Sequence, residues 1–146
     1  MKALTSRTSM AALGALALGA VLATAQPAAA AVVSETGPLR FLELGSEATI
    51  DAKGAVVFAA VTVTCDPGSY GSIQVNLTQS AANRLAKGTA TKEVTCDGTP
   101  QQVQLTVVAS DRPFRTGEAW GSASALVCGD TGCVSMFEEH IVTIVK

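Results

Sequence analysis

Residues 55–65, AVVFAAVTVTC, decide the fold class, because every second side chain in the run is small or apolar. An extended strand would carry the apolar set on one face: Val57, Ala59, Val61, Val63 and Cys65. Thr62 and Thr64 would fall on the opposite face. A period of two is typical of a half-buried β-strand. Asp66-Pro67-Gly68 then predicts a turn, with Pro at its second position and Gly where φ is positive.

The same alternation recurs on both sides of this strand. The further predicted strands are residues 47–51, 72–79, 88–96, 102–109, 118–128 and 134–145. Short alternating segments separated by Gly, Pro and Asp are typical of a β-sandwich or barrel. Seven strands in about a hundred residues predict an all-β fold, an immunoglobulin-like Greek-key β-sandwich.

Three segments depart from the plain pattern. Residues 31–45 read as an extended lead-in, whose apolar side chains either dock on the core or form an edge strand. Residues 79–86 resemble a short helix. The alternation of the last strand shifts near Glu138-Glu139, which predicts a β-bulge or an irregularity of an edge strand. On the sixth strand, small residues gather on one face and predict a close approach of two sheets: Ala119, Gly121, Ala123 and Ala125.

Residues 1–30 have the pattern of a secretory signal peptide. Lys2 and Arg7 precede the apolar run AALGALALGAVLATA, and the small residues at 28–31 provide the cleavage site. The alternative is a membrane anchor, but a spanning helix needs about 20 strongly apolar residues. This run is diluted by Ala and Gly. We therefore expect a secreted domain over residues 46–146, preceded by the lead-in at 31–45, with no membrane contact after cleavage.

Charge excludes one class of partner. Lys2 and Arg7 leave with the signal peptide, so the mature chain keeps eight basic residues against 12 acidic ones, a net charge near −4. Binding that follows the phosphates of a nucleic acid needs a concentrated Lys/Arg surface. We expect no nucleic-acid partner.

The four cysteines predict two disulfides. In an exported chain of this size an even count is typical of a disulfide framework, and four cysteines allow three pairings. Cys128 and Cys133 flank a Gly-Asp-Thr-Gly turn, which favours a local bridge and leaves Cys65 with Cys96. If successive strands alternate in direction, the second, fourth and sixth strands all end at one pole of the domain. A metal or redox site is the alternative, but the chain has one histidine.

Nothing in the sequence matches catalytic machinery. His140 is the only histidine; we interpret it as an outward strand residue paired with a carboxylate. Glu138 and Glu139 are adjacent on a strand, so they point to opposite faces and cannot act on one bond. Three aspartates follow strand ends and indicate either self-bonded turns, which we favour, or a calcium site: Asp66, Asp97 and Asp130. We expect a protein that is not an enzyme and has no cofactor or metal.

Five residues are candidates for binding. Tyr70 is predicted in a loop at the disulfide pole, and the loop at 110–117 places Arg112, Phe114 and Arg115 at the opposite pole. Aromatic and arginine side chains are enriched at protein contact hot spots. The alternative, which we favour, is that Phe114 tucks under its loop while the arginines are solvated. Trp120 is either a core residue or a groove wall, and the core is favoured.

The chain resembles small secreted immunoglobulin-like proteins of actinobacteria, whose function is uncharacterised. The resemblance rests on the Ala-rich signal, the strand ends Thr64-Cys65 and Val94-Thr95-Cys96, a Phe-containing loop and the close final cysteine pair. More remotely, the Ala-Trp-Gly strand and the C-x4-C hairpin look like apo-chromoproteins related to neocarzinostatin. That second resemblance implies a ligand cleft. Cys65 and Cys96 lie too far apart in sequence for that family's other bridge, so no ligand residue is carried over.

These patterns predict a secreted, non-enzymatic module that binds a protein or a cell-surface component through the loops of a rigid sandwich. One alternative is a carrier of a small apolar ligand beside Trp120. The other is an inhibitor of a secreted enzyme, acting through the loop at 110–117.

Overall fold

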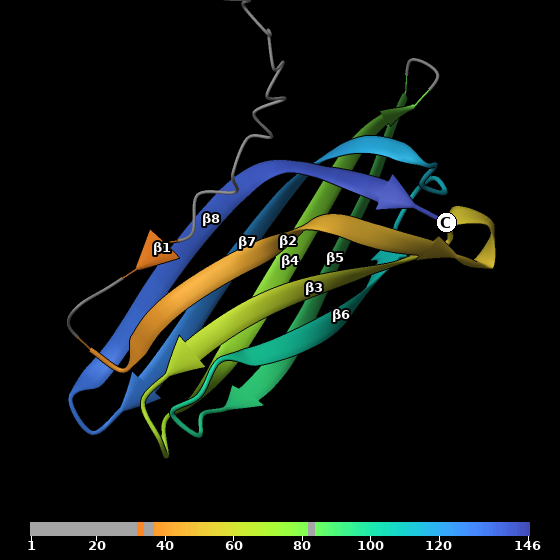
Figure 1. Ribbon diagram of the computed structural model, residues 1–146. Helices are drawn as coiled ribbons and strands as arrows, with labels where there is room; N and C mark the ends of the chain where they lie inside the picture. The colour runs from red at the N-terminus through yellow and green to blue at the C-terminus, as the bar shows by residue number, and fades with distance from the viewer. Residues whose placement is uncertain (1–31, 34–36, 82–83) are drawn as a thin grey trace, which may run out of the picture.

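The computed structural model describes residues 32–33, 37–81 and 84–146, nearly all of them in β-strands (Figure 1). The strands are β1 (Val32–Val33), β2 (Leu39–Asp51), β3 (Val56–Cys65), β4 (Tyr70–Ala81), β5 (Arg84–Thr95), β6 (Gln101–Ala109), β7 (Gly117–Gly129) and β8 (Gly132–Val145). A short 3-10 turn, η1 (Ala52–Gly54), joins β2 to β3. The predicted signal peptide lies outside the described residues. Where the chain is described, no helix has the length and apolar character needed to cross a bilayer.

The strands form one sheet that closes on itself. The order is β1-β2-β3-β6-β5-β4-β7-β8, and β8 pairs back with β2. Strands β2 to β8 therefore make a ring of seven, with β1 added antiparallel to the start of β2. The chain is all-β with two disulfides, as predicted.

The prediction of two separate sheets needs correction. Long ladders unite β2, β3 and β6 on one side and β5, β4, β7 and β8 on the other. Short ladders join the two groups. The β5–β6 ladder pairs only Gly88 with Ala109 and Thr89 with Val108, and the parallel β2–β8 ladder spans only residues 47–49 of β2. These two short seams close the strands into a barrel.

The predicted lead-in belongs to the barrel wall. Strand β2 begins at Leu39, inside the segment 31–45, and Leu39, Leu42 and Leu44 are fully buried. Its register against β3 shifts between Leu44 and Ala48, where three residues of β2 lie opposite Ala60. This bulge bends β2, so that its first half pairs with β1 and its second half with β8. The domain therefore starts at least seven residues before the predicted boundary at 46.

The predicted inward faces are confirmed for β3, β4 and β6. The buried set on these strands is Val57, Ala59, Val61, Val63, Cys65, Ile73, Val75, Leu77, Val103, Leu105 and Val107. The small residues of β7 also face inward, as predicted. A Cβ on Gly121 would lie 2.9 Å from the Leu44 side chain and 3.4 Å from that of Leu77. Leucines of β2 and β4 thus fill the space that the small side chains of β7 leave.

Two local predictions are wrong. The helix-like window at 79–86 lies, where described, in β4 and β5, because its residues continue the β4–β5 ladder up to Ala81 and Arg84. Strand β8 has no bulge at Glu138-Glu139: the β7–β8 register runs without a shift from Gly117 opposite Ile144 to Gly129 opposite Gly132. In both segments, pairing with the neighbouring strand determines the structure and overrides the preference suggested by the local sequence pattern.

Both predicted disulfides are present and lie at the same pole. Cys65 bonds Cys96, and Cys128 bonds Cys133. The strand register brings these ends together, because Tyr70 lies opposite both Thr95 and Cys128. This end of the barrel, called the disulfide pole below, is at the lower left of Figure 1. The first bridge is buried in the core, and the second lies on the surface of the β7–β8 hairpin.

The two bridges should differ in their effect on stability. They close loops of sequence separation 31 and 5. In the chain-entropy model, Cys65→Ala with Cys96→Ala lowers the free energy of unfolding by about 3.5 kcal/mol, and the Cys128/Cys133 pair by about 2 kcal/mol. Guanidinium denaturation of the two double variants measures both losses. A larger loss for the 128–133 variant would contradict a loop-length origin.

Candidate binding surfaces and the buried Glu138–His140 pair

The structure separates the five predicted binding residues. Tyr70 is 67% exposed and Trp120 is 47% exposed, both on the outside of the barrel. Trp120 is therefore not in the core, contrary to the favoured interpretation. Phe114 is only 2% exposed and anchors its loop from below, so it presents no ring to a partner. Arg112 and Arg115 are exposed at the pole opposite the disulfides.

Tyr70 and Trp120 belong to one continuous surface. Strands β5, β4, β7 and β8 lie side by side, and their outward side chains form what we call the outer face. On it, Trp120 lies directly opposite Ile141 of β8, while Phe137 lies opposite Ser124. Leu126 is diagonal to Phe137 and two residues from Cys128, the partner of Tyr70. Directly opposed and diagonal side chains on one face of a sheet are in reach of each other.

On β4, β7 and β8, the large apolar side chains of the outer face are each about half exposed or more: Tyr70, Trp120, Leu126, Phe137 and Ile141. The sequence analysis missed the last three. The sequence does indicate them, because β7 and β8 carry apolar residues at outward positions as well as at inward ones. Alternation is normally used to assign apolar residues to the core, so outward apolar residues are easily set aside.

Short uncharged polar groups lie between these side chains on β4, β7 and β8. They are Ser72, Gln74, Asn76, Thr78, Ser122, Ser124 and Ser135. The Thr89 hydroxyl donates to Asn76 Oδ1 at 2.8 Å, so the central amide is held in place. A hollow of about 340 Å³ lies at the disulfide-pole end, lined among others by Tyr70, Ser72 and Leu126.

His140 faces the barrel interior, which corrects the prediction that it points outward. Because the β7–β8 ladder is unbroken, Glu138 and His140 share the inward face of β8 with Met136 and Val142. Glu138 is 4% exposed, and its Oε1 lies 3.1 Å from His140 Nδ1. The predicted carboxylate partner is therefore present, but Glu138 is buried and the His140 side chain is only 16% exposed.

Glu138 connects β8 to β2. Its Oε2 accepts a hydrogen bond of 2.7 Å from the backbone N–H of Leu44. That N–H lies between the end of the β1 pairing, at Leu42, and the start of the β8 pairing, at Glu47. The carboxylate thus takes the place of a ladder partner where β2 and β8 diverge. A buried carboxylate whose oxygens are directed at a backbone amide and a histidine holds the wall together, and neither group is placed to reach a ligand outside.

Two of the three aspartates singled out at the disulfide pole, Asp97 and Asp66, are engaged in a turn and in a surface ion pair. Asp97 Oδ1 accepts from the Thr99 backbone N–H at 2.8 Å and from the Thr99 hydroxyl at 2.7 Å. Asp66 pairs with the Arg40 guanidinium at 3.0 Å. Within the described residues, no three His, Cys, Asp or Glu side chains are grouped so that they could hold a metal ion.

Hydrogen bonding lowers the pKa of Asp97 from 3.8 to about 2. The Gln101 side chain contributes most, followed by the Thr99 backbone and the Thr99 hydroxyl. These donors favour the ionised form of the carboxyl.

Comparison with known proteins shows only distant structural likeness. No family model matches the chain, and no characterised protein matches its sequence significantly. The structure is similar to that of AggA, the major subunit of aggregative adherence fimbriae type I from Escherichia coli, with a TM-score of 0.40 and 12% identity over 74% of this chain and 95% of that one. It is also similar to Spo0M, a sporulation control protein from Bacillus subtilis, with a TM-score of 0.37 and 12% identity over 76% of this chain and 51% of that one. Neither likeness assigns a function to this chain.

Replacing Glu138 should destabilise the barrel, and by less when the new side chain can still accept the hydrogen bond from the Leu44 N–H. Glu138→Ala leaves the Leu44 N–H without an acceptor and creates a cavity, which lowers the free energy of unfolding by about 3 kcal/mol. Glu138→Gln keeps an acceptor oxygen and costs about 1 kcal/mol. The control is Glu139→Ala, an exposed neighbour, with a change of about 0.5 kcal/mol or less. Urea denaturation measures all three, and equal losses for Glu138→Ala and Glu139→Ala would contradict the role of the buried carboxylate.

The titration of Asp97 should depend on Thr99. Because the folded pKa is lowered, the contribution of Asp97 to stability is present above pH 3.8 and is lost as the pH falls towards 2. Thr99→Ala removes the hydroxyl donor and should raise the pKa of Asp97 towards 3.8. NMR titration of the Asp97 carboxyl carbon reports the value directly, and an unchanged pKa in Thr99→Ala would show that the hydroxyl has no part in it.

Proposed function

We propose that this chain is a secreted, non-enzymatic module that binds a partner protein against its outer face. The observation that carries the proposal is the row of Tyr70, Leu126, Phe137, Trp120 and Ile141 on one outward surface. The two disulfides support an oxidising compartment, since such bonds persist mainly outside the reducing cytosol.

The composition of the outer face favours a protein partner. The centres of protein interfaces are rich in Tyr, Trp and Phe and poor in charge. In the part of the chain that the structure describes, the centre of the outer face carries one charged residue, Glu139. Glu93, Lys87 and Glu118 lie towards the margins of the face. Rigid aromatic anchors among Ser and Asn side chains are also typical of antibody paratopes. The hollow beside Tyr70 and Leu126 would receive a side chain of the partner.

The two alternatives have less support. A carrier would need Trp120 to line an enclosed cleft, but Trp120 projects outward from β7. An inhibitor would present the loop at 110–117 as an extended bait, but Phe114 is buried and its N–H donates to Gly54 O at 2.8 Å. The loop is tied to the barrel.

The test combines affinity capture with surface variants. The protein is immobilised and exposed to secreted and cell-wall protein fractions, and the captured partner is then titrated against Trp120→Ser and Phe137→Ser. Each variant should weaken binding by about 30-fold or more, as expected for hot-spot residues. Val108→Ser on β6 is the matched control, because Val108 is equally exposed but lies on another strand group.

Two outcomes would contradict the proposal. A partner bound equally well by Trp120→Ser, Phe137→Ser and Val108→Ser would exclude the outer face. A concentration-dependent dimer that Trp120→Ser abolishes would show that the face is occupied by a second copy of the chain.

A further inference from the structure

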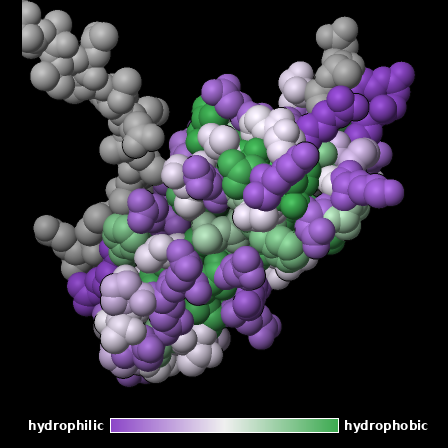
Figure 2. Space-filling model, turned by 45° about the vertical axis from the view of Figure 1, so that its right-hand side comes forward, coloured by the Kyte–Doolittle hydropathy of each residue, from purple (hydrophilic) through white to green (hydrophobic). Residues whose placement is uncertain are grey.

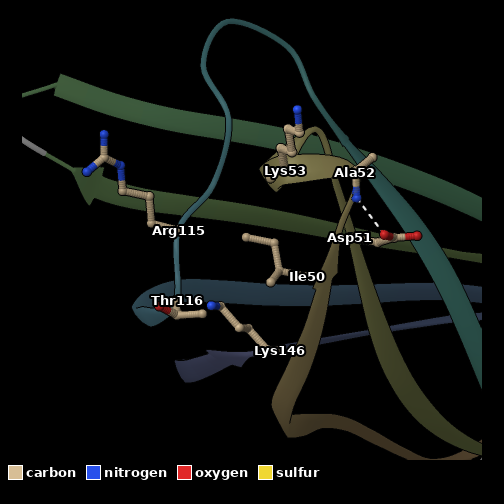
Figure 3. A pocket seen from close by; sticks show the side chains of 8 residues that line it. Ile50, Asp51, Ala52, Lys53, Arg115, Thr116 and Lys146 are labelled. Atoms are coloured by element: carbon tan, nitrogen blue, oxygen red, sulfur yellow. Dashed lines mark hydrogen bonds between the residues drawn. The ribbon is translucent and has the colours of Figure 1, made fainter.

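A groove lies at the pole opposite the disulfides, called the groove pole below. It has a volume of about 560 Å³ and lies between η1, the end of the loop before β7 and the end of β8. Its lining includes three basic residues, one from each of these segments: Lys53, Arg115 and Lys146. Figure 3 shows their side chains around Ile50 and Thr116.

The acidic side chain of the groove is engaged in its own turn. Asp51 Oδ1 accepts from the Ala52 backbone N–H at 2.6 Å, and Figure 3 shows this carboxylate on the side away from Arg115 and Lys146. One of its two oxygens therefore caps η1. The groove keeps a surplus of positive charge.

The wall that carries Arg115 is fixed by buried groups. Gln79, 4% exposed, accepts from the Arg115 N–H at 2.8 Å and donates from Nε2 to the Arg115 carbonyl at 2.8 Å. Next to it, Phe114 is buried and bonded to Gly54 O. A Cβ on Gly54 would collide with the Phe114 carbonyl, so the two loops meet as closely as a glycine allows. The backbone at Arg115 and the η1 turn are thus held together before any ligand arrives.

The turn that carries Lys53 is strained. Ala52 has φ 47° and Lys53 has φ 56°, values that residues with a Cβ adopt at an energetic cost. Residues 52–55 connect the paired Asp51 and Val56, and Gly54 is the one glycine among them. Positions with positive φ normally favour Gly, Asn or Asp. Strain of this kind is concentrated at functional sites, so an observed outlier supports a hypothesis of function.

Charge is distributed unevenly between the poles. Among the residues that the structure describes, six basic ones lie towards the groove pole: Lys53, Arg84, Lys87, Arg112, Arg115 and Lys146. Four acidic ones accompany them: Glu47, Asp51, Asp111 and Glu118. Figure 2 shows strongly hydrophilic side chains gathered beside the tip of the β4–β5 hairpin. In a chain that is acidic overall, such a pole attracts anions and steers their approach.

We propose that the groove binds a phosphate group carried by a larger ligand. The planar guanidinium of Arg115 can pair with two oxygens of a phosphate. The ammonium groups of Lys53 and Lys146, which lie apart from it in Figure 3, add positive charge at other sides of the groove. Ile50 supplies an apolar contact for the part of the ligand next to the phosphate. The site is independent of the outer face and needs no protein partner.

The test is calorimetric titration of the purified protein, with any affinity tag at the N-terminus so that Lys146 is unaltered. Inorganic tripolyphosphate is the small probe and poly(glycerol phosphate) is the polymer probe. Binding should weaken with added NaCl, and Lys53→Gly and Arg115→Gln should each weaken it about tenfold. Ala52→Gly should keep the affinity within about twofold.

Because glycine relieves the strain, Ala52→Gly and Lys53→Gly should both raise the melting temperature by about 3 °C.

The control is Lys92→Gln, which removes an equal charge outside the groove, where the ammonium donates to Gln104 O. Tighter binding of poly(glycerol phosphate) per phosphate would support a phosphate polymer as the natural ligand, and tighter binding of tripolyphosphate would support a free phosphorylated compound. The proposal is overturned if neither probe binds, or if Lys92→Gln weakens binding as much as Lys53→Gly does.

Discussion

Closure of the barrel at β2 is the constraint on which the rest of the structure depends. On the edge of β2 that faces β8, the backbone N–H and C=O groups need hydrogen-bond partners, because a buried unpaired N–H costs free energy. The β1 pairing serves this side up to Leu42, and the β8 pairing serves it from Glu47. In the gap, the Glu138 carboxylate accepts the Leu44 N–H. An ionisable side chain thus completes a seam that the backbone ladders leave open.

The parts of the fold that could be predicted follow from local chemistry. Alternation placed Val57 to Val63 and Ile73 to Leu77 on inward faces. The turn between Cys128 and Cys133 favoured a local bridge and left Cys65 with Cys96, and the alternating direction of successive strands put both bridges at one pole. The seams could not be predicted, because they depend on three or fewer residue pairs between strands distant in sequence. The inward direction of Glu138 and His140 was missed for a related reason: a charged pair interrupts the apolar face, which resembles a change of phase.

The candidate binding residues show a limit of the same rule. On β7 the inward positions are Ala and Gly, while Trp120 and Leu126 point outward. This arrangement is stable because leucines of β2 and β4 already fill the interior opposite Gly121. A barrel interior of fixed volume has room for large side chains from only some of its strands. Sequence alternation identifies the two faces of β7 and its small residues indicate the inner one, but the packing of distant strands is what explains why the small face, and not the face of Trp120, is inside.

The two ends of the barrel are held in different ways, and the difference bears on function. At the disulfide pole, covalent bridges and relaxed turns such as Asp97–Thr99 stabilise the fold directly. At the groove pole, a buried glutamine and a close backbone contact hold Arg115 beside a turn that is strained at Ala52 and Lys53. Stability alone would favour glycine in that turn. The strain at Lys53 and the hydrogen bonds that fix the backbone of Arg115 support the proposal that the two side chains bring positive charge to one groove.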